Sequence, residues 1–368
     1  MEKKTFNTVT RVMAVIAALL ILVGAASMLP SATRGSGKTG DVYASSSGLA
    51  ADAVVMTVDG RNVTAQEYLY YVLNYGYQYY SYFAMSGAPV DWATPVEEGS
   101  DMTLADLVSA QAQESVVQDA VLCNMAAKNG ITVTQEDEEE FRANIASMKE
   151  MYGEDLESVL MPYGLTEKLW AVRNDISCLT FGLQEAYTGG TLYPDEAAMQ
   201  ELIEEHGLTM ARSVLVSTAY LEDDGIEQAK AAAEEYRTRI LEAEDMAAEL
   251  MAVNAELGVA EEENVAGLYH CGHDHGDGEE DTICRVLTAL KVGEISEVVE
   301  TEEGFYLLLR EEMDPDTVAQ VKFSEDVEAA VSGAEVVVNT VNMDKLDVGQ
   351  FIENYMAALS AVTAQSAG

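Results

Sequence analysis

ALKVGEISEVVETEEGFYLLLREE (Ala289–Glu312) is the segment of this chain that says most about its fold. An apolar helix end meets a Lys-Val-Gly-Glu turn, and Glu303–Gly304 then leads into an apolar run over Phe305–Arg310. Nearer the N-terminus, MARSVLVS (Met210–Ser217) is a second short apolar run. Runs of this length, bounded by turn residues, are typical of β-strands. The charged stretch between them, 225–258, has helical character, so the sequence predicts a small unit of strands and helices.

The two strand segments resemble those of the parvulin family, which has a small β-α-β peptidyl-prolyl isomerase fold. The first family strand reads His-x-Leu-Val, and the last reads Gly, an aromatic or aliphatic residue, His and two aliphatic residues. Ser213 stands at the first histidine position of this chain and Tyr306 at the second. The resemblance implies that these two side chains occupy the catalytic place. It also implies an apolar proline pocket with candidate walls at Leu215, Leu268, Ile283 and Phe305.

The replaced histidines affect the predicted chemistry. Rotation about an X-Pro amide has a barrier of about 18–20 kcal/mol. A parvulin lowers that barrier with an apolar pocket and a polar network centred on its histidines. Without imidazoles, this chain is expected to keep the scaffold and to have weak or no isomerase activity. The alternative is an active isomerase in which Ser213 and Tyr306 hydrogen-bond each other and still polarise the amide.

Charge narrows the possible partners. The 368 residues include 64 acidic and 20 basic ones, for a formal net charge of −44. Such a surface repels phosphate backbones, which excludes nucleic acid as a partner. It favours basic or unfolded cationic polypeptides, although solubility alone also explains an acidic surface. The sequence contains no P-loop, dinucleotide fingerprint or HExxH motif.

The N-terminus has the pattern of a targeting segment. Residues 1–30 carry three basic residues ahead of an apolar run over Val12–Leu29. This order keeps the N-terminal end in the cytoplasm and predicts an extracytoplasmic location for the rest, anchored to the membrane or secreted. A cleaved signal peptide and a retained anchor both fit. Residues 31–52, rich in Ser, Gly, Ala and Thr, are expected to form a flexible linker.

A hairpin and a capped helix open the next region. VVMTVDGRNV (Val54–Val63) predicts two strands joined at Asp-Gly, and Thr64 with Glu67 predicts a capping box. These residues resemble the opening of the N-terminal chaperone domain of SurA- and PrsA-like foldases. The resemblance implies an α+β, mostly helical protein whose C-terminal segment packs back on the N-terminal domain. The expected boundaries are 53–190 for the helical domain, 191–208 for a linking helix, 209–313 for the parvulin-like domain and 314–368 for the returning segment.

Tyrosines line one face of the helix that follows Thr64. They recur every three or four residues at Tyr68, Tyr71, Tyr75, Tyr79 and Tyr82. Tyrosine rings suit loose contact with extended polypeptide, so Tyr71 and Tyr75 are candidate client-binding residues. Packing in the core is the alternative and the more common reason for such a stripe.

GLYHCGHDHGDGEEDTIC (Gly267–Cys284) is unusual in its histidines and cysteines. Imidazole and thiolate at this spacing are ligands for transition metals, with candidates His270, Cys271, His273 and His275. A polar surface loop is the alternative, and no other cofactor is indicated. A disulfide between Cys271 and Cys284 would compete with metal ligation by Cys271. Cys123 and Cys178 lie in apolar helical stretches and are expected to be buried thiols.

The function predicted from these features is an exported, membrane-associated foldase-like chaperone that binds unfolded secreted polypeptides. The alternatives are an active peptidyl-prolyl isomerase and a metal-binding envelope protein that uses the histidine-rich segment.

Overall fold

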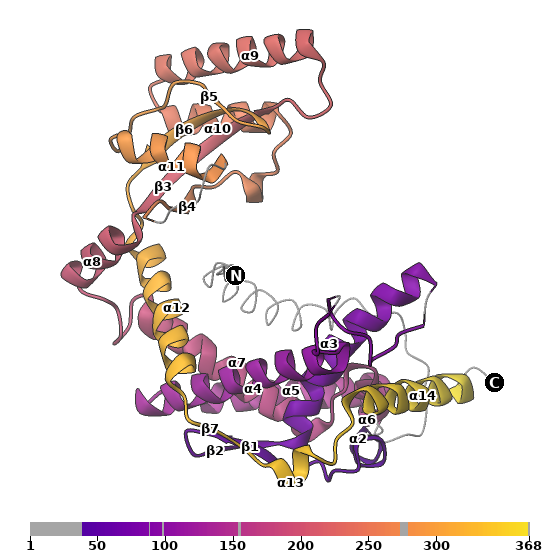
Figure 1. Cartoon of the computed structure of the whole chain (residues 1–368). Coiled ribbons are helices and arrows are strands. Elements are labelled where there is room, and N and C mark those ends of the chain that lie inside the picture. Colours follow the sequence, from indigo (N-terminus) through magenta and orange to yellow (C-terminus); the bar gives the residue numbers. More distant parts are fainter. Residues whose placement is uncertain (1–38, 88, 98, 154–155, 273–278, 367–368) are drawn as a thin grey trace. The chain divides into compact units, whose positions relative to one another are not determined.

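The structure is a computed structural model, and it describes residues 39–87, 89–97, 99–153, 156–272 and 279–366 (Figure 1). It is mostly helical with two small antiparallel sheets, so the predicted α+β class is confirmed. Unit 1 comprises the chain up to Glu185 and from Ser324 onward, and unit 2 comprises Ala186–Phe323. Within the described ranges, no helix has the length and apolarity needed to cross a bilayer. The expected targeting segment, 1–30, lies outside them.

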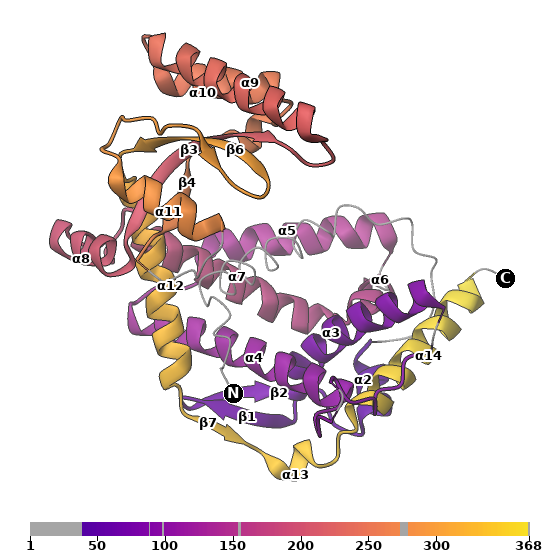
Figure 2. The ribbon, with the colours of Figure 1, turned by 45° about the horizontal axis from the view of Figure 1, so that its top comes forward.

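Unit 1 contains a three-stranded sheet built from both ends of the chain. Its strands, in the spatial order β2-β1-β7, are β2 (Arg61–Thr64), β1 (Val54–Val58) and β7 (Val336–Val338). Asp59 and Gly60 both have positive φ, as the tight β1–β2 turn requires. The Asp59 carboxylate accepts a hydrogen bond from the Glu335 amide at 2.8 Å. The C-terminal strand therefore pairs with β1 along the edge opposite β2, as Figure 2 shows.

Helices pack around this sheet. They are α2 (Thr39–Ser47), α3 (Ala65–Ser86), α4 (Leu104–Lys128), α5 (Gln135–Tyr152), α6 (Leu156–Leu160), α7 (Glu167–Tyr187), α13 (Thr340–Met343) and α14 (Val348–Ser366), with a 3₁₀ turn at Met161–Tyr163. The Glu67 half of the predicted capping box is present, since the Thr64 amide donates to a Glu67 carboxylate oxygen at 2.8 Å. The chain leaves unit 1 near the end of α7 and returns within α12 (Pro315–Gly333).

The predicted flexible linker at 31–52 is wrong from Thr39 onward. Helix α2 begins there, and Tyr43 is fully buried in the core of unit 1. The Tyr43 ring lies 6.0 Å from that of Phe351 and 5.5 Å from that of Tyr355, both on α14. A single large ring among small residues leaves no apolar period, so the sequence pattern did not indicate this contact.

Unit 2 is built on a four-stranded antiparallel sheet in the order β4-β3-β6-β5. Its elements are α8 (Glu196–His206), β3 (Leu208–Ser217), α9 (Asp223–Glu242), α10 (Met246–Glu256), a 3₁₀ turn (Glu261–Glu263), β4 (Gly267–His270), α11 (Glu279–Ala289), β5 (Val299–Glu300) and β6 (Gly304–Glu311). The long central pair, β3 and β6, is formed by the two segments that the sequence singled out.

The two faces of this sheet are covered by different helices. On the face called here the back face, Val214, Phe305 and Leu307 pack against α9 and α10. On the front face, Ala211 and Leu308 pack against Ile283 and Leu287 of α11. Figure 2 shows α9 and α10 on one side of the sheet and α11 on the other. Residues 213 and 306 are on the front face, because the register and the side-chain alternation of strands place them there.

Candidate functional site

Ser213 and Tyr306 are diagonal neighbours on the front face of unit 2. In the β3–β6 register Ser213 is opposite Leu308, and Leu215 is opposite Tyr306. Diagonal neighbours in an antiparallel pair lie about 7–8 Å apart. Ser213, Leu215 and Tyr306 are all half-buried, whereas Val214 and Val216, on the back face, are buried. The structure thus brings the two predicted catalytic positions and one predicted pocket wall onto one partly accessible surface.

Glu303 contacts this site, and sequence reasoning missed it. The Tyr306 hydroxyl donates a hydrogen bond to a Glu303 carboxylate oxygen at 2.9 Å. The Tyr306 hydroxyl is thus bonded to a carboxylate, whereas the alternative of an active isomerase pairs it with Ser213. Gly304 permits this turn, because its φ is +146° and a Cβ would lie only 2.3 Å from the Val216 carbonyl oxygen. The Glu-Gly sequence directly before a strand is the signal from which the position of Glu303 beside this site could have been predicted.

Two buried asparagines on the back face hold the main chain of Ser213. The Asn254 amide, on α10, donates to the Ser213 carbonyl oxygen and to the Asn264 side-chain oxygen, both at 2.9 Å. Asn264 in turn donates to the Met251 carbonyl oxygen at 2.8 Å. Pairing of β3 with β4 stops at Ala211, opposite the first residue of β4, so the side chain of Asn254 takes the place of a neighbouring strand at Ser213. No sequence motif pointed to this pair.

The predicted pocket walls divide between the two faces. Ile283 lies on α11 and packs against the front face, where it is buried with Leu308. The predictions for Phe305 and Leu268 are wrong. Phe305 is buried in the back-face core, and Leu268 is opposite Met210, which shares the back-face alternation of β3. Adjacent strand residues point to opposite faces, so Phe305 cannot line the same site as Tyr306.

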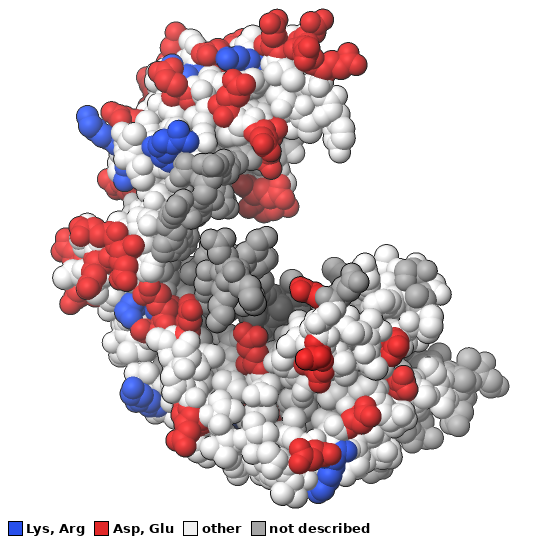
Figure 3. All heavy atoms as spheres, viewed as in Figure 1, with Lys and Arg blue, Asp and Glu red and all other residues white. Residues whose placement is uncertain are grey.

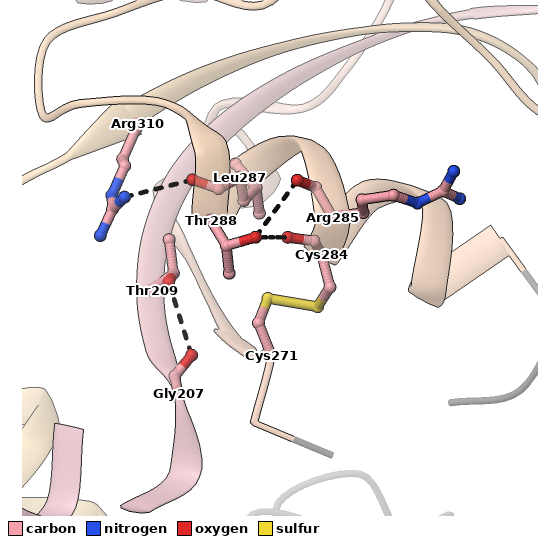
Figure 4. The surroundings of a disulfide bond; sticks show 8 residues. All are labelled: Gly207, Thr209, Cys271, Cys284, Arg285, Leu287, Thr288 and Arg310. Atoms are coloured by element: carbon pink, nitrogen blue, oxygen red, sulfur yellow. Dashed lines mark hydrogen bonds between the residues drawn. A yellow bond between two sulfur atoms is a disulfide. The ribbon is translucent and has the colours of Figure 1, made fainter. Parts of the chain in front are cut away.

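Helix α11 is attached to the sheet at two points, its middle and its C-terminal end (Figure 4). At the middle of the helix, Cys284 forms a disulfide with Cys271, which follows β4 directly. Near its C-terminal end, the Arg310 guanidinium donates to the carbonyl oxygens of Leu287 and Leu290. These attachments hold the helix that carries Ile283 against the front face.

The disulfide removes the Cys271 thiolate that the metal prediction requires. β4 alternation also directs Cys271 toward the front-face cluster and its neighbour His270 toward the opposite side. The His270 ring instead lies 6.5 Å from that of His206, at the end of α8. Among the residues that the structure describes, no three His, Cys, Asp or Glu side chains are grouped to hold a metal ion. His273 and His275 lie outside those residues.

The tyrosine prediction is wrong for Tyr71, which belongs to the core of unit 1. Its hydroxyl donates to Asp119 at 2.9 Å, and Asp119 also forms an ion pair with Arg173. Burial raises the pKa of Asp119, and the Arg173 charge opposes that rise. The Arg173 guanidinium lies 5.1 Å from the centre of the Tyr71 ring. Tyr75 is half-buried and its hydroxyl is bonded to that of Ser115 at 2.9 Å, so it is also committed to packing.

Exposed apolar side chains gather instead on the C-terminal half of α3. Their exposed fractions are 57% for Tyr77, 43% for Tyr80, 70% for Tyr82 and 90% for Met85. No charged residue occurs between Tyr77 and Ser86, although most charged residues on the face drawn in Figure 3 are acidic. These four residues are called the α3 patch. The tyrosine spacing predicted the helix, but the candidate client-binding residues, Tyr71 and Tyr75, lie in the part of it that packs in the core of unit 1.

No protein-family model and no curated protein sequence matches this chain. Among solved structures it aligns with PrsA from Bacillus subtilis at 17% identity, covering 72% of this chain and 91% of that one, with a TM-score of 0.27. The foldase protein PrsA of Lactococcus lactis aligns at 16% identity, over 85% and 98% of the two chains, with a TM-score of 0.26. A SurA-like chaperone of Campylobacter jejuni aligns at 11% identity, over 78% and 98%, with a TM-score of 0.23.

These are the classes of protein that the sequence motifs resemble. All three TM-scores are below 0.5, so the alignments carry no argument about the function of this chain. Its candidate sites are defined by its own strands, helices and contacts.

Proposed function

We propose that this protein is a foldase-like chaperone that binds unfolded polypeptides. The observation that carries the proposal is the α3 patch, where four large apolar side chains within nine residues are 43–90% exposed. Large apolar side chains that stay exposed close together on one helix are typical of interaction sites. Tyrosine rings provide contact area at low conformational cost, and their hydroxyls bond to varied polar partners. Such a surface suits clients without a fixed shape.

A second surface for clients is the front face of unit 2. There the half-buried Leu215 offers apolar contact, and Ser213 and Tyr306 offer hydroxyls. No imidazole stands at either position, and the Tyr306 hydroxyl is bonded to Glu303. Isomerase activity is therefore expected to be weak or absent, while binding to extended polypeptide is retained.

The proposed place of action is outside the cytoplasmic membrane. Its support is the order of basic and apolar residues in 1–30, which is typical of an export signal or an N-terminal anchor. A chaperone in that place would receive secreted polypeptides before they fold. Fractionation of cells that express the full chain, with carbonate extraction of the membranes, separates an anchored from a released form.

The binding proposal is tested by suppression of client aggregation. The purified full chain, at several-fold molar excess, is expected to slow the aggregation of a chemically unfolded protein diluted from denaturant. The Y77S/Y80S/Y82S variant is expected to lose most of this effect. Its matched control is M151S/F181S, because Met151 and Phe181 are 65% and 62% exposed on other helices of unit 1. A wild-type chain without effect, or equal losses in both variants, would contradict the proposal.

Isomerase activity is tested separately with a protease-coupled assay on a proline-containing peptide. A rate close to that of the uncatalysed exchange is expected for the full chain. A clear enhancement that S213A and Y306F both abolish would instead support an active isomerase centred on those hydroxyls. An enhancement that neither substitution changes would place any activity elsewhere.

A further inference from the structure

The contact between Tyr306 and Glu303 bears on which polypeptide segments the front face prefers. The Tyr306 hydroxyl uses its hydrogen in the bond to the Glu303 carboxylate. The phenolic oxygen of Tyr306 and the carboxylate of Glu303 can then act only as hydrogen-bond acceptors toward a ligand. Glu303 is exposed, so its carboxylate can meet a ligand without a conformational change in the buried sheet. An acceptor pair that carries negative charge complements ammonium and guanidinium groups.

We propose that Glu303 makes the front face of unit 2 selective for polypeptide segments in which a lysine or arginine lies next to an apolar residue. This inference rests on the proposed function and names the class of client. The apolar residue contacts the region of Leu215, and the cationic side chain extends to Glu303. Glu303 is thus a specificity-determining residue of the binding surface.

The turn that carries Glu303 is held in place by several contacts, which lowers the cost of ordering it on binding. The Glu303 carbonyl oxygen accepts a hydrogen bond from the Thr218 amide at 2.9 Å. Thr301 donates to the Gly304 carbonyl oxygen through both its amide, at 2.9 Å, and its hydroxyl, at 3.1 Å. Gly304 lies so close to Val216 that no side chain fits there. The carboxylate therefore extends from a fixed point at the edge of the front face.

The neighbouring carboxylates of the same turn differ from Glu303 in their contacts. Glu300 already forms an ion pair with Lys230 of α9, at 3.6 Å. Glu302 is also exposed and immediately precedes Glu303, but of the two it is Glu303 that accepts the hydrogen bond from Tyr306. Glu302 therefore provides a matched control, since its neutralisation changes the net charge by the same amount at almost the same place.

The test uses two peptides of one apolar sequence, one with a central lysine and one with norleucine in its place. Binding of each to the full chain is measured by fluorescence anisotropy at low and at high salt. For an exposed ion pair, wild type is expected to prefer the lysine peptide about two- to five-fold at low salt. That preference should shrink at high salt, where the charges are screened.

Variants assign the preference to a residue. E303Q is expected to abolish it and E302Q to leave it within error of wild type. Y306F removes the phenolic acceptor and leaves the Glu303 carboxylate in place, so it is expected to reduce the preference without abolishing it. Equal losses in E303Q and E302Q would show a general effect of the acidic surface and would overturn the proposal. Equal binding of the two peptides by wild type would overturn it as well.

The outcomes separate this inference from the function on which it rests. If neither peptide binds and client aggregation is unaffected, the chaperone proposal itself is wrong. If both peptides bind equally well and aggregation is suppressed, the chaperone proposal stands and selectivity by Glu303 is refuted.

Discussion

Loss of the Cys271–Cys284 disulfide is expected to destabilise unit 2 and to leave unit 1 unchanged. The two cysteines are 13 residues apart in the sequence. A cross-link that closes a loop near 15 residues long restricts the unfolded chain enough to stabilise the fold by about 3 kcal/mol. Replacing either cysteine opens the same loop. C271A, C284A and the double variant are therefore expected to lose similar amounts, without additivity.

The position of the disulfide indicates which part of unit 2 loses stability. It joins the end of β4 to α11, so it stabilises the layer that covers the front face. Arg310 still holds the C-terminal end of α11 in the variants. The sheet itself keeps its back-face core with α9 and α10. Unit 2 should therefore still fold, with a smaller free energy of unfolding.

Hydrogen exchange followed by mass spectrometry can measure this change. In peptides from β3 and β6, the slowest amides should exchange roughly 100-fold faster in the variants, as a loss of about 3 kcal/mol requires. Trp92 and Trp170, the two tryptophans of the chain, both belong to unit 1. Tryptophan fluorescence during denaturation is thus an internal control, and its midpoint should not move.

Two results would refute this reasoning. Exchange in β3 and β6 that changes less than about five-fold would mean that the unfolded loop is already restricted without the cross-link. A matching shift of the tryptophan midpoint would mean that unit 1 depends on the disulfide. Addition of reductant to the wild type should reproduce the double variant, because the buried Cys123 and the half-buried Cys178 are free thiols already.

Three further predictions concern other contacts. D119N leaves the buried Arg173 without its counter-charge, so denaturation should show that the free energy of unfolding of unit 1 falls by about 3–5 kcal/mol. E138Q, in the exposed pair with Arg142, should lower it by less than about 0.5 kcal/mol. Similar losses in the two variants would contradict the importance of burial. F305A should destabilise unit 2 by about 3–5 kcal/mol, because it leaves a cavity in the back-face core, and Y306F by less than about 1 kcal/mol. Hydrogen exchange in β3 measures both losses. A larger loss in Y306F than in F305A would mean that Tyr306, and not Phe305, is the core residue. Hydrogen bonds from the Thr103 hydroxyl and then from its backbone amide lower the pKa of Asp106 below 3.8. The capping box of α4 is therefore complete above that pH, and its stabilisation is lost as the pH falls through the lowered pKa. T103A should raise this pKa in a carboxyl NMR titration, and an unchanged value would refute the assignment.

Features that depend on neighbouring residues could be predicted from the sequence. The strands β3 and β6, the Asp59–Gly60 hairpin and the Thr64–Glu67 capping box each follow from a few adjacent side chains. The pairing of the two strands followed from the family resemblance of their motifs. Ser213 and Tyr306 therefore lie on one face, as that resemblance requires.

Features that depend on distant residues could not be predicted in this way. Tyr43 is buried because Phe351 and Tyr355 of α14 meet it, and nothing near Tyr43 indicates that contact. The number of exposed tyrosines on α3 depends on where the packing of α4 and α14 ends along the helix. Phe305 is different, since the alternation of strand side chains already excludes it from the face of Tyr306.

The pairing of β7 with β1 has a consequence for biosynthesis. When a ribosome has released the first 320 residues, β1 and β2 have no third strand, and Tyr43 lacks its packing partners Phe351 and Tyr355 on α14. The intervening unit, by contrast, has all of its own strands by then and can fold during translation. The core of unit 1 is thus incomplete until β7 and α14 emerge, so premature termination ahead of these elements should damage the fold far more than the number of lost residues suggests.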